Sequence, residues 1–214
     1  MNIDKNTTLT PKFVPSWGKD FRFDPEKHEY IVDGVVWPSP TQLIKEFGIV
    51  DYSGAHFSEE AKMRGKAVHA AIQFFDDGDL DESTVHESLR GYLDAWKLFR
   101  SDHELNFIMS EVPLMSDTHM FCVTPDRVFK NKNGVGVLEI KTGETPEKAL
   151  RLQTIAQLIA ANEALGVFDL SVPRLIVKLE KSGSYKLKKI DDGYDVDFDN
   201  FLSLVKIHFL KRGK

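Results

Sequence analysis

The sequence predicts an α/β fold with a mixed central β-sheet flanked by helices. Apolar residues occur at helical spacing through much of residues 39–101. Strand-like apolar runs then follow, first within residues 106–143 and later near 172–180 and 184–190. Helical segments at 146–165 and 196–211 follow these strands. Strands that alternate with helices in this way are typical of a sheet covered by helices.

The composition fits a single globular domain. The chain has 214 residues, of which 42% are apolar and 29% charged. Its net charge of −5 is mildly unfavourable for a nucleic-acid binder, although a local basic surface would suffice. The lone Cys122 excludes an internal disulfide and a multi-cysteine cluster. Without a secretory signal or a run long enough to span a bilayer, we expect a cytoplasmic protein with no membrane contact.

The N-terminal part is expected to be an extension, residues 1–57, packed on a core of residues 58–214 within one structural domain. Residues 1–20 are polar and predict a loosely ordered lead-in. Residues 21–37 predict a hairpin that turns at Asp33-Gly34. Ser39 and Pro40 then predict the start of a short helix that ends at Gly48.

The remaining elements follow from periodicity and from capping residues. Ser58 is the expected N-cap of a helix that ends before Asp76, and Pro146 is expected to begin the helix after the first three strands. Ser182-Gly183 is the expected turn between the last two strands. The other expected helix covers about 83–101, and the first three strands cover 107–114, 120–129 and 135–141.

Asp126, Glu139 and Lys141 are the strongest candidates for chemistry. Asp126 lies at the start of one apolar run, and Glu139-Ile140-Lys141 ends the next. If the two runs form a hairpin, the two carboxylates lie near each other, and strand alternation places Glu139 and Lys141 on one face. The carboxylates and the Ile140 carbonyl are oxygen ligands of the kind that Mg²⁺ prefers. Lys141 could orient a water molecule or stabilise negative charge, so the pattern indicates phosphodiester hydrolysis.

Pro125-Asp126 together with Glu139-Ile140-Lys141 resembles the signature of the PD-(D/E)XK nuclease superfamily. Two further elements resemble the RecB-like exonuclease branch, and in particular its small phage-type members. Gly65 and His69 are similar to its Gly-x-x-x-His element, and Gln153 begins a run similar to its Gln-x-x-x-Tyr element. The resemblance covers roughly residues 60–180.

This resemblance implies a restriction-endonuclease-like core and a metal site. It implies that His69 is a further metal ligand beside Asp126, Glu139 and the Ile140 carbonyl, with Mg²⁺ as the ion and Mn²⁺ as a substitute. Glu111 is either a solvated strand residue or an extra acidic ligand of the kind found in the superfamily. The cysteines that hold an iron–sulfur cluster in some relatives are absent, so we expect no cluster.

Two positions depart from the family pattern, and several basic residues have two interpretations. Thr124 stands where many members have Gly, and Gln157 stands where the Tyr is expected. Gln153 is interpreted as a substrate-binding residue, and Arg151 and Lys148 either contact phosphates or form a solubilising face. Five lysines of the last hairpin either lie along DNA or balance nearby acids; they are at 178, 181, 186, 188 and 189.

The hypothesis is therefore a metal-dependent deoxyribonuclease, an exonuclease acting on DNA ends or single strands. The resemblance implies a role in recombination, repair or phage DNA processing in a bacterial or phage-infected cell. It also implies a recombination or single-strand-binding protein as a partner, and an oligomer is compatible with it. Two alternatives stay open, namely a structure-specific or restriction-like endonuclease and a non-catalytic module that binds DNA or protein.

Overall fold

The computed structural model describes residues 18–51, 58–167 and 172–213 of the chain. Its centre is a five-stranded sheet in the order β10-β9-β8-β7-β4. β8 and β9 pair in parallel, whereas the other neighbouring strands of this sheet are antiparallel. The predicted mixed sheet is therefore confirmed. Its strands are β4 (Asn106–Ser110), β7 (Arg127–Asn131), β8 (Gly134–Lys141), β9 (Arg174–Leu179) and β10 (Tyr185–Ile190).

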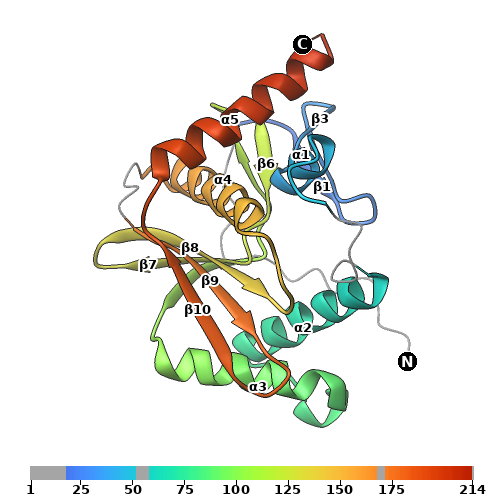
Figure 1. Ribbon diagram of the computed structural model, residues 1–214, viewed down its shortest axis with the longest axis vertical. Helices are drawn as coiled ribbons and strands as arrows, with labels where there is room; N and C mark the ends of the chain where they lie inside the picture. Colours follow the sequence, from blue (N-terminus) through green and yellow to red (C-terminus); the bar gives the residue numbers. More distant parts are fainter. Residues whose placement is uncertain (1–17, 52–57, 168–171, 214) are drawn as a thin grey trace.

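Helices cover both faces of this sheet (Figure 1). One face packs against α2 (Glu59–Asp77) and α3 (Glu87–Asp102), and the other packs against α4 (Glu147–Leu165), which α5 (Tyr194–Lys211) covers in turn. Successive side chains of β8 point to opposite faces of the sheet, and they therefore enter two different cores. Leu138 and Ile140 enter the core shared with α2 and α3, while Val135 and Val137 enter the core shared with α4.

The crossover from β8 to β9 runs through α4, as a parallel strand pair requires. Twelve of its residues are buried, so apolar side chains occur nearly all round the helix. The helix ends at Gly166, whose positive φ of 63° gives a left-handed C-cap. Because Lys141 ends β8 just before this crossover, the end of β8 lies beside α4.

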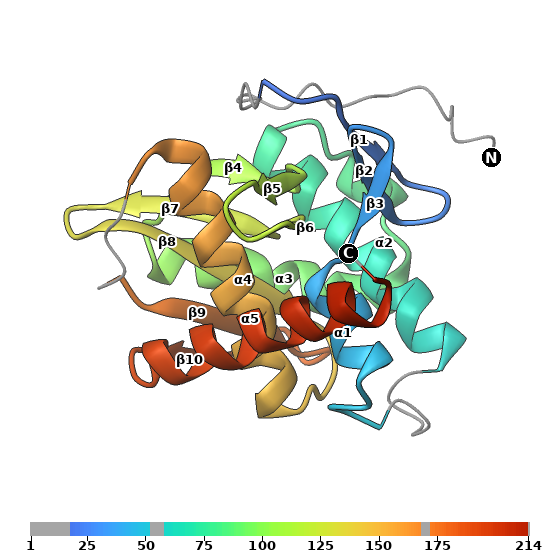
Figure 2. The ribbon, with the colours of Figure 1, turned by 90° about the horizontal axis from the view of Figure 1, so that it is seen from above.

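The predicted N-terminal hairpin is a three-stranded sheet of β1 (Phe21–Asp24), β2 (Glu29–Val32) and β3 (Val35–Trp37), with the turn between β2 and β3 at Asp33-Gly34 as expected. It packs on a second small sheet of β5 (Leu114–Ser116) and β6 (Phe121–Val123), and Cys122 is buried between the two. Figures 1 and 2 show these strands and α1 (Pro40–Glu46) on the same side as the N-terminal half of α2.

Two predicted strands were wrong in a way that matters for the site. The run 107–114 divides into β4 and β5, because Glu111 adopts a positive φ of 53° and Pro113 follows it. The run 120–129 divides into β6 and β7, with Thr124, Pro125 and Asp126 between them. In each case the two halves belong to different sheets. Periodicity alone predicted continuous strands because both halves are apolar.

The helix starts at Ser39-Pro40 and at Ser58 are confirmed, and Ser39 forms a reciprocal capping box with Gln42. The helix expected from 83 begins at Glu87, because Glu82–Thr84 form a separate 3₁₀ turn. The lead-in 1–17 and the boundary at residue 57 lie outside the described residues, so the division into extension and core stays a prediction. Across the described ranges, every helix is too short or too polar to cross a membrane.

Candidate active site

Side chains from three separate elements meet at one point of the fold. His69 comes from α2, Glu111 follows β4, and Asp126 precedes β7. The Nδ1 atom of His69 lies 3.0 Å from Oε1 of Glu111 and 3.6 Å from Oδ1 of Asp126. One potential ligand atom from each of the three residues lies within 4.8 Å of the other two. The structure thus brings together His69 and two acidic residues that are 42 and 57 positions further along the chain.

The breaks between strands position the two acidic residues. Glu111 takes a left-handed conformation, which is unusual for a residue with a side chain and is found mainly where function or packing enforces it. Its N–H group donates to the carbonyl oxygen of Asp126 at 3.2 Å. The sequence predicted that Glu111 belongs to a strand. In the structure it lies instead in a strained turn after β4. This turn directs its carboxylate towards His69.

Asp126 is anchored to the neighbouring strand. It is 8% exposed, and its Oδ2 accepts a hydrogen bond from the backbone N–H of Ile140 at 2.6 Å. This bond connects Asp126 to the residue between Glu139 and Lys141. The predicted proximity of Asp126 to the end of β8 is therefore present. β7 and β8 form the predicted antiparallel hairpin, with Arg127 opposite Leu138, and the bond to Ile140 holds the Asp126 side chain against β8. The role of the Ile140 carbonyl as a metal ligand stays a prediction.

Glu139 and Lys141 share one face of β8 and bind each other. Oε1 of Glu139 accepts from Nζ of Lys141 at 2.5 Å, and Oε2 accepts from Nε2 of Gln157 at 2.5 Å. Glu139 is 5% exposed, yet it does not belong to the group of three ligand atoms around His69. Each of its oxygens accepts one hydrogen bond and keeps a further lone pair, so Glu139 could bind a metal ion while it stays bonded to Lys141 and Gln157.

The charges in this cluster are strongly coupled. Burial and the nearby charge of Glu139 raise the pKa of Asp126 to about 7. Burial alone would lower the pKa of His69, but Asp126 and the hydrogen bond to Glu111 outweigh it and raise this pKa to about 9. Burial would raise the pKa of Glu139, yet Lys141 and Gln157 together hold it below its usual value. A buried group of acids with few cations is a favourable place for an added positive ion.

The donor set fits a divalent cation. Two carboxylates and an imidazole converge, and carboxylate oxygens with one imidazole suit Mg²⁺ and Mn²⁺. In the metal-free arrangement, the raised pKa means that His69 carries a proton at neutral pH and bridges the two acids. A bound cation would take the place of that proton.

The residues predicted to contact the substrate have different surroundings. Gln153 donates from Nε2 to Thr41 of α1 at 3.2 Å, and its buried Oε1 has no partner among the described residues. Arg151 binds Glu147, Asp192 and Asp197, and its role as a phosphate contact stays a prediction. Lys148 is exposed on α4, and its role stays a prediction.

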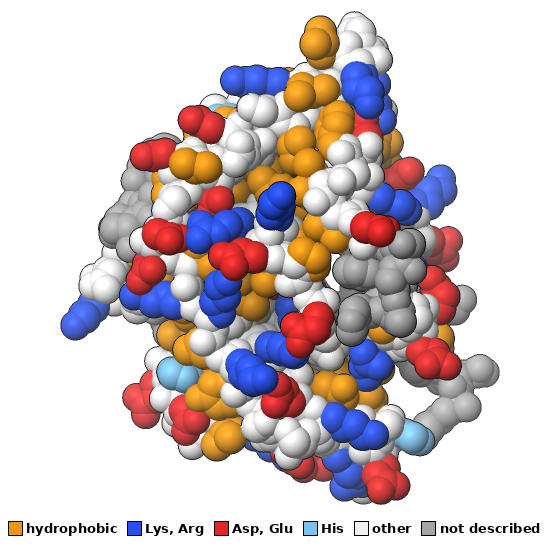
Figure 3. Space-filling view, viewed as in Figure 1, with side chains coloured by type: hydrophobic (Ala, Val, Ile, Leu, Met, Phe, Trp, Pro, Cys, Tyr) orange, Lys and Arg blue, Asp and Glu red, His pale blue; other side chains and the backbone are white. Residues whose placement is uncertain are grey.

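The basic hairpin balances nearby acids. Lys178, Lys186, Lys188 and Lys189 each pair with a carboxylate, namely that of Glu144, Glu180, Glu147 and Asp191 respectively. On the face seen in Figure 3, basic and acidic side chains are intermixed rather than separated into a basic stripe. The structure thus favours the second interpretation of these lysines.

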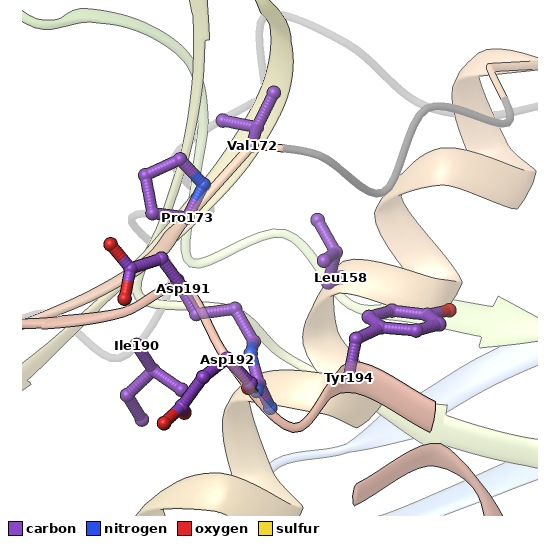
Figure 4. A pocket seen from close by; sticks show the side chains of 8 residues that line it. Leu158, Val172, Pro173, Ile190, Asp191, Asp192 and Tyr194 are labelled. Atoms are coloured by element: carbon purple, nitrogen blue, oxygen red, sulfur yellow. Dashed lines mark hydrogen bonds between the residues drawn. The ribbon is translucent and has the colours of Figure 1, made fainter. Parts of the chain in front are cut away.

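A small pocket lies elsewhere, between the C-terminal half of α4 and the loops that flank β9 and β10. Figure 4 shows Leu158, Pro173 and Tyr194 lining it, and its volume is about 70 Å³. None of the residues that line it belongs to the cluster around His69. This pocket can hold little more than water.

Sequence reasoning missed the part that Gln157 plays and gave no role to Asp76 or Arg127. Gln157 was noted only as a departure from the family Tyr, although it binds Glu139 directly. Thr124, the other departure, forms a 2.9 Å hydrogen bond between its Oγ1 and the hydroxyl of Tyr30 in the N-terminal sheet. The available signal for Arg127 was a charged residue directly before the apolar pair Val128-Phe129.

Replacing Gln157 by Leu is expected to shift the pH dependence of any activity at this site. Glu139 would keep only Lys141 as a side-chain partner, so its pKa would rise. The acid limb of the pH–rate profile would move to higher pH, and activity near pH 6 would fall about tenfold or more. Gln157→Glu would worsen the effect through charge repulsion. An unchanged acid limb in Gln157→Leu would contradict this role.

The chain matches no model of a known protein family and no curated protein. Among solved structures it is similar to an alkaline exonuclease (LHK-Exo) from Laribacter hongkongensis, with 13% identity, a TM-score of 0.40, and coverage of 82% of this chain and 91% of that one. It is also similar to LHK-Exo in complex with dAMP, with 14% identity, a TM-score of 0.41, and coverage of 83% and 92%. The sequence identities and TM-scores are low, and the functional conclusion therefore rests on the geometry of the site.

Proposed function

We propose that this chain is a divalent-metal-dependent nuclease that hydrolyses phosphodiester bonds of DNA, and that it acts as an exonuclease. The observation that supports it is the convergence of His69, Glu111 and Asp126 directly beside Glu139 and Lys141. A metal-ligand group next to a lysine can activate a water molecule and stabilise the negative charge that develops in phosphodiester hydrolysis. The PD-(D/E)XK signature in Asp126, Glu139 and Lys141 gives this combination its nuclease interpretation.

Each side chain has a distinct part in the proposed reaction. His69, Glu111 and Asp126 would hold a Mg²⁺ or Mn²⁺ ion, which supplies Lewis-acid charge stabilisation when bound. Glu139 would complete the ligand set, and its hydrogen bond keeps Lys141 oriented. Lys141 would donate a hydrogen bond to the attacking water or to a phosphate oxygen, which places positive charge where negative charge develops. Gln153, whose buried Oε1 has no hydrogen-bond partner among the described residues, would help to hold the DNA strand.

The finer assignments are also proposals. Gly65 and His69 on α2, with Gln153 on α4, favour the RecB-like exonuclease branch and its phage-type members, and hence a cytoplasmic role in recombination, repair or phage DNA processing. A recombination or single-strand-binding protein is the partner that this role implies. A β-carbon added to Gly65 would lie 3.8 Å from Oγ1 of Thr142, so α2 passes close to the end of β8.

Incubation with end-labelled linear DNA and with closed circular DNA separates the three functions. The exonuclease proposal expects Mg²⁺- or Mn²⁺-dependent release of short products from linear DNA, no cutting of the circle, and no reaction in EDTA. Cutting of the circle would instead establish an endonuclease. Binding of DNA without any hydrolysis, and without titratable binding of Mn²⁺, would support the non-catalytic module and overturn the proposal.

The stability of the metal-free protein is expected to fall as pH rises from 6.5 to about 9. The folded protein raises the pKa of His69 from 6.5 to about 9, so the stabilisation from its proton is complete below pH 6.5 and lost through pH 9. Asp126 acts in the same direction at lower pH, because its pKa rises from 3.8 to about 7 and its contribution is lost between these values. Melting temperatures in EDTA at several pH values measure this decline.

Added Mn²⁺ should reverse that trend, because the metal competes with the proton on His69. The increase in melting temperature on adding Mn²⁺ should therefore be larger at pH 9 than at pH 6.5. In His69→Gln, both the decline between these pH values and the difference in metal response should shrink. A metal response that is equal at both pH values in the unaltered protein would count against His69 as a ligand.

A further inference from the structure

A buried ion pair joins α2 to the strand that follows Asp126. Arg127 is fully buried, and its Nε and Nη2 atoms donate to Oδ2 of Asp76 at 3.1 and 2.9 Å. Asp76 lies in the last turn of α2, and its Oδ1 accepts from the indole Nε1 of Trp96 at 3.0 Å. The Arg127 guanidinium also lies 5.5 Å from the Trp96 ring and 5.8 Å from the Phe107 ring. Its orientation is therefore fixed on several sides.

The remaining arm of Arg127 reaches the candidate site. Its Nη1 donates to the carbonyl oxygen of Asp126 at 2.7 Å. The same carbonyl accepts the N–H of Glu111. One oxygen atom thus connects the turn that carries Glu111, the residue Asp126 itself, and, through Arg127 and Asp76, the helix that carries His69. All three elements that supply ligand atoms to the cluster are joined at this point.

We propose that Asp76 and Arg127 are positioning residues that set the distance between His69 and the two acids, and thereby the affinity of the site for its metal ion. The inference rests on the proposed function, because it requires the cluster to bind a metal. His69 lies seven residues before Asp76 on α2, about 10 Å along the helix axis at 1.5 Å per residue. A helix held at this point keeps its position along the sheet.

Apolar contacts alone would not fix that position. Val68 and Ile72 of α2 pack on the core, but hydrophobic contacts are non-directional and tolerate sliding. A guanidinium that binds one carboxylate through two N–H groups has a defined geometry. A buried ion pair is often no more stabilising than apolar side chains of the same size. The value of this pair therefore lies in the geometry that it imposes on the site.

The test measures metal affinity separately from stability. Mn²⁺ binding is followed by isothermal titration calorimetry at pH 8, and thermal melting shows the folded fraction, for Asp76→Asn and Arg127→Lys. The matched control is Asp197→Asn, since Asp197 is 5% exposed and accepts from Arg174 at 2.6 Å and Arg151 at 3.1 Å, away from the cluster. We expect both positioning variants to lose about 10- to 100-fold in Mn²⁺ affinity, whereas the control loses stability and keeps its affinity.

The outcomes separate this inference from the proposed function. If the unaltered protein does not bind Mn²⁺, the proposed function fails. If it binds Mn²⁺ and the folded positioning variants bind equally well, the proposed function stands and this inference is overturned. Should either single variant fail to fold, the double variant Asp76→Leu with Arg127→Met decides, because it removes both charges from the interior. Unchanged Mn²⁺ affinity in that folded double variant would also overturn the inference.

Discussion

Asp126→Asn is expected to abolish metal-dependent cleavage of DNA without weakening the fold. The Asn carbonyl can still accept the N–H of Ile140, so the local geometry is retained. The buried carboxylate already has its pKa raised to about 7, which means that the folded protein disfavours its charge. A neutral amide should therefore leave the metal-free protein equally or more stable at pH 8. Loss of a carboxylate ligand to a catalytic ion removes several kcal/mol of transition-state stabilisation, or about 10³-fold in rate.

Asp197→Asn is the control, and it is expected to lose stability while it retains activity. Asp197 is as buried as Asp126, but it is paired with two arginines outside the cluster. Breaking a buried ion pair leaves uncompensated charge, which costs about 3–5 kcal/mol. The variant should melt at a lower temperature and keep its rate of DNA cleavage while folded. Initial rates of DNA cleavage and melting curves are measured for Asp126→Asn and Asp197→Asn. An active Asp126→Asn variant would remove Asp126 from the proposed reaction.

Lys141→Met is expected to lower kcat by about 10²- to 10⁴-fold while the protein still binds Mn²⁺. Lys141 donates to Glu139 and is not itself a metal ligand, so its loss should leave the ligands in place. Glu139 would lose its cation, and its pKa would rise. Single-turnover kinetics together with Mn²⁺ titration would distinguish this loss of chemistry from a loss of metal.

The matched control is Lys178→Met. Lys178 is the direct neighbour of Lys141 across the β8–β9 pair, and its side chain is 26% exposed compared with 23% for Lys141. It pairs with Glu144 rather than with Glu139. A change of a few-fold at most is expected, mainly in KM. Equal losses in the two variants would mean that Lys141 contributes only general positive charge.

The sequence by itself determined much of the fold. Caps at Ser39 and Ser58 marked helix starts because their side chains satisfy backbone N–H groups locally. The apolar run of β8 and the crossover helix after Lys141 were readable for the same reason, since periodicity and capping depend on neighbours in the chain. The mixed sheet followed from the order of these elements. The choice of Asp126, Glu139 and Lys141 depended on a short motif of this kind.

The tertiary structure alone decided how the site is assembled. The breaks at Glu111 and at 124–126 occur where each predicted strand changes sheet. Pro113 and Pro125 mark the breaks in the sequence, but the choice of pairing partner for each half leaves no local mark. For the same reason, sequence spacing did not reveal that Gln157 binds Glu139 or that Arg151 binds Asp192 and Asp197. Long-range packing fixes which buried charges meet, and burial then sets their pKa values. The sequence thus supplied the chemical groups, and the packing of α2 and α4 on the sheet determined their geometry.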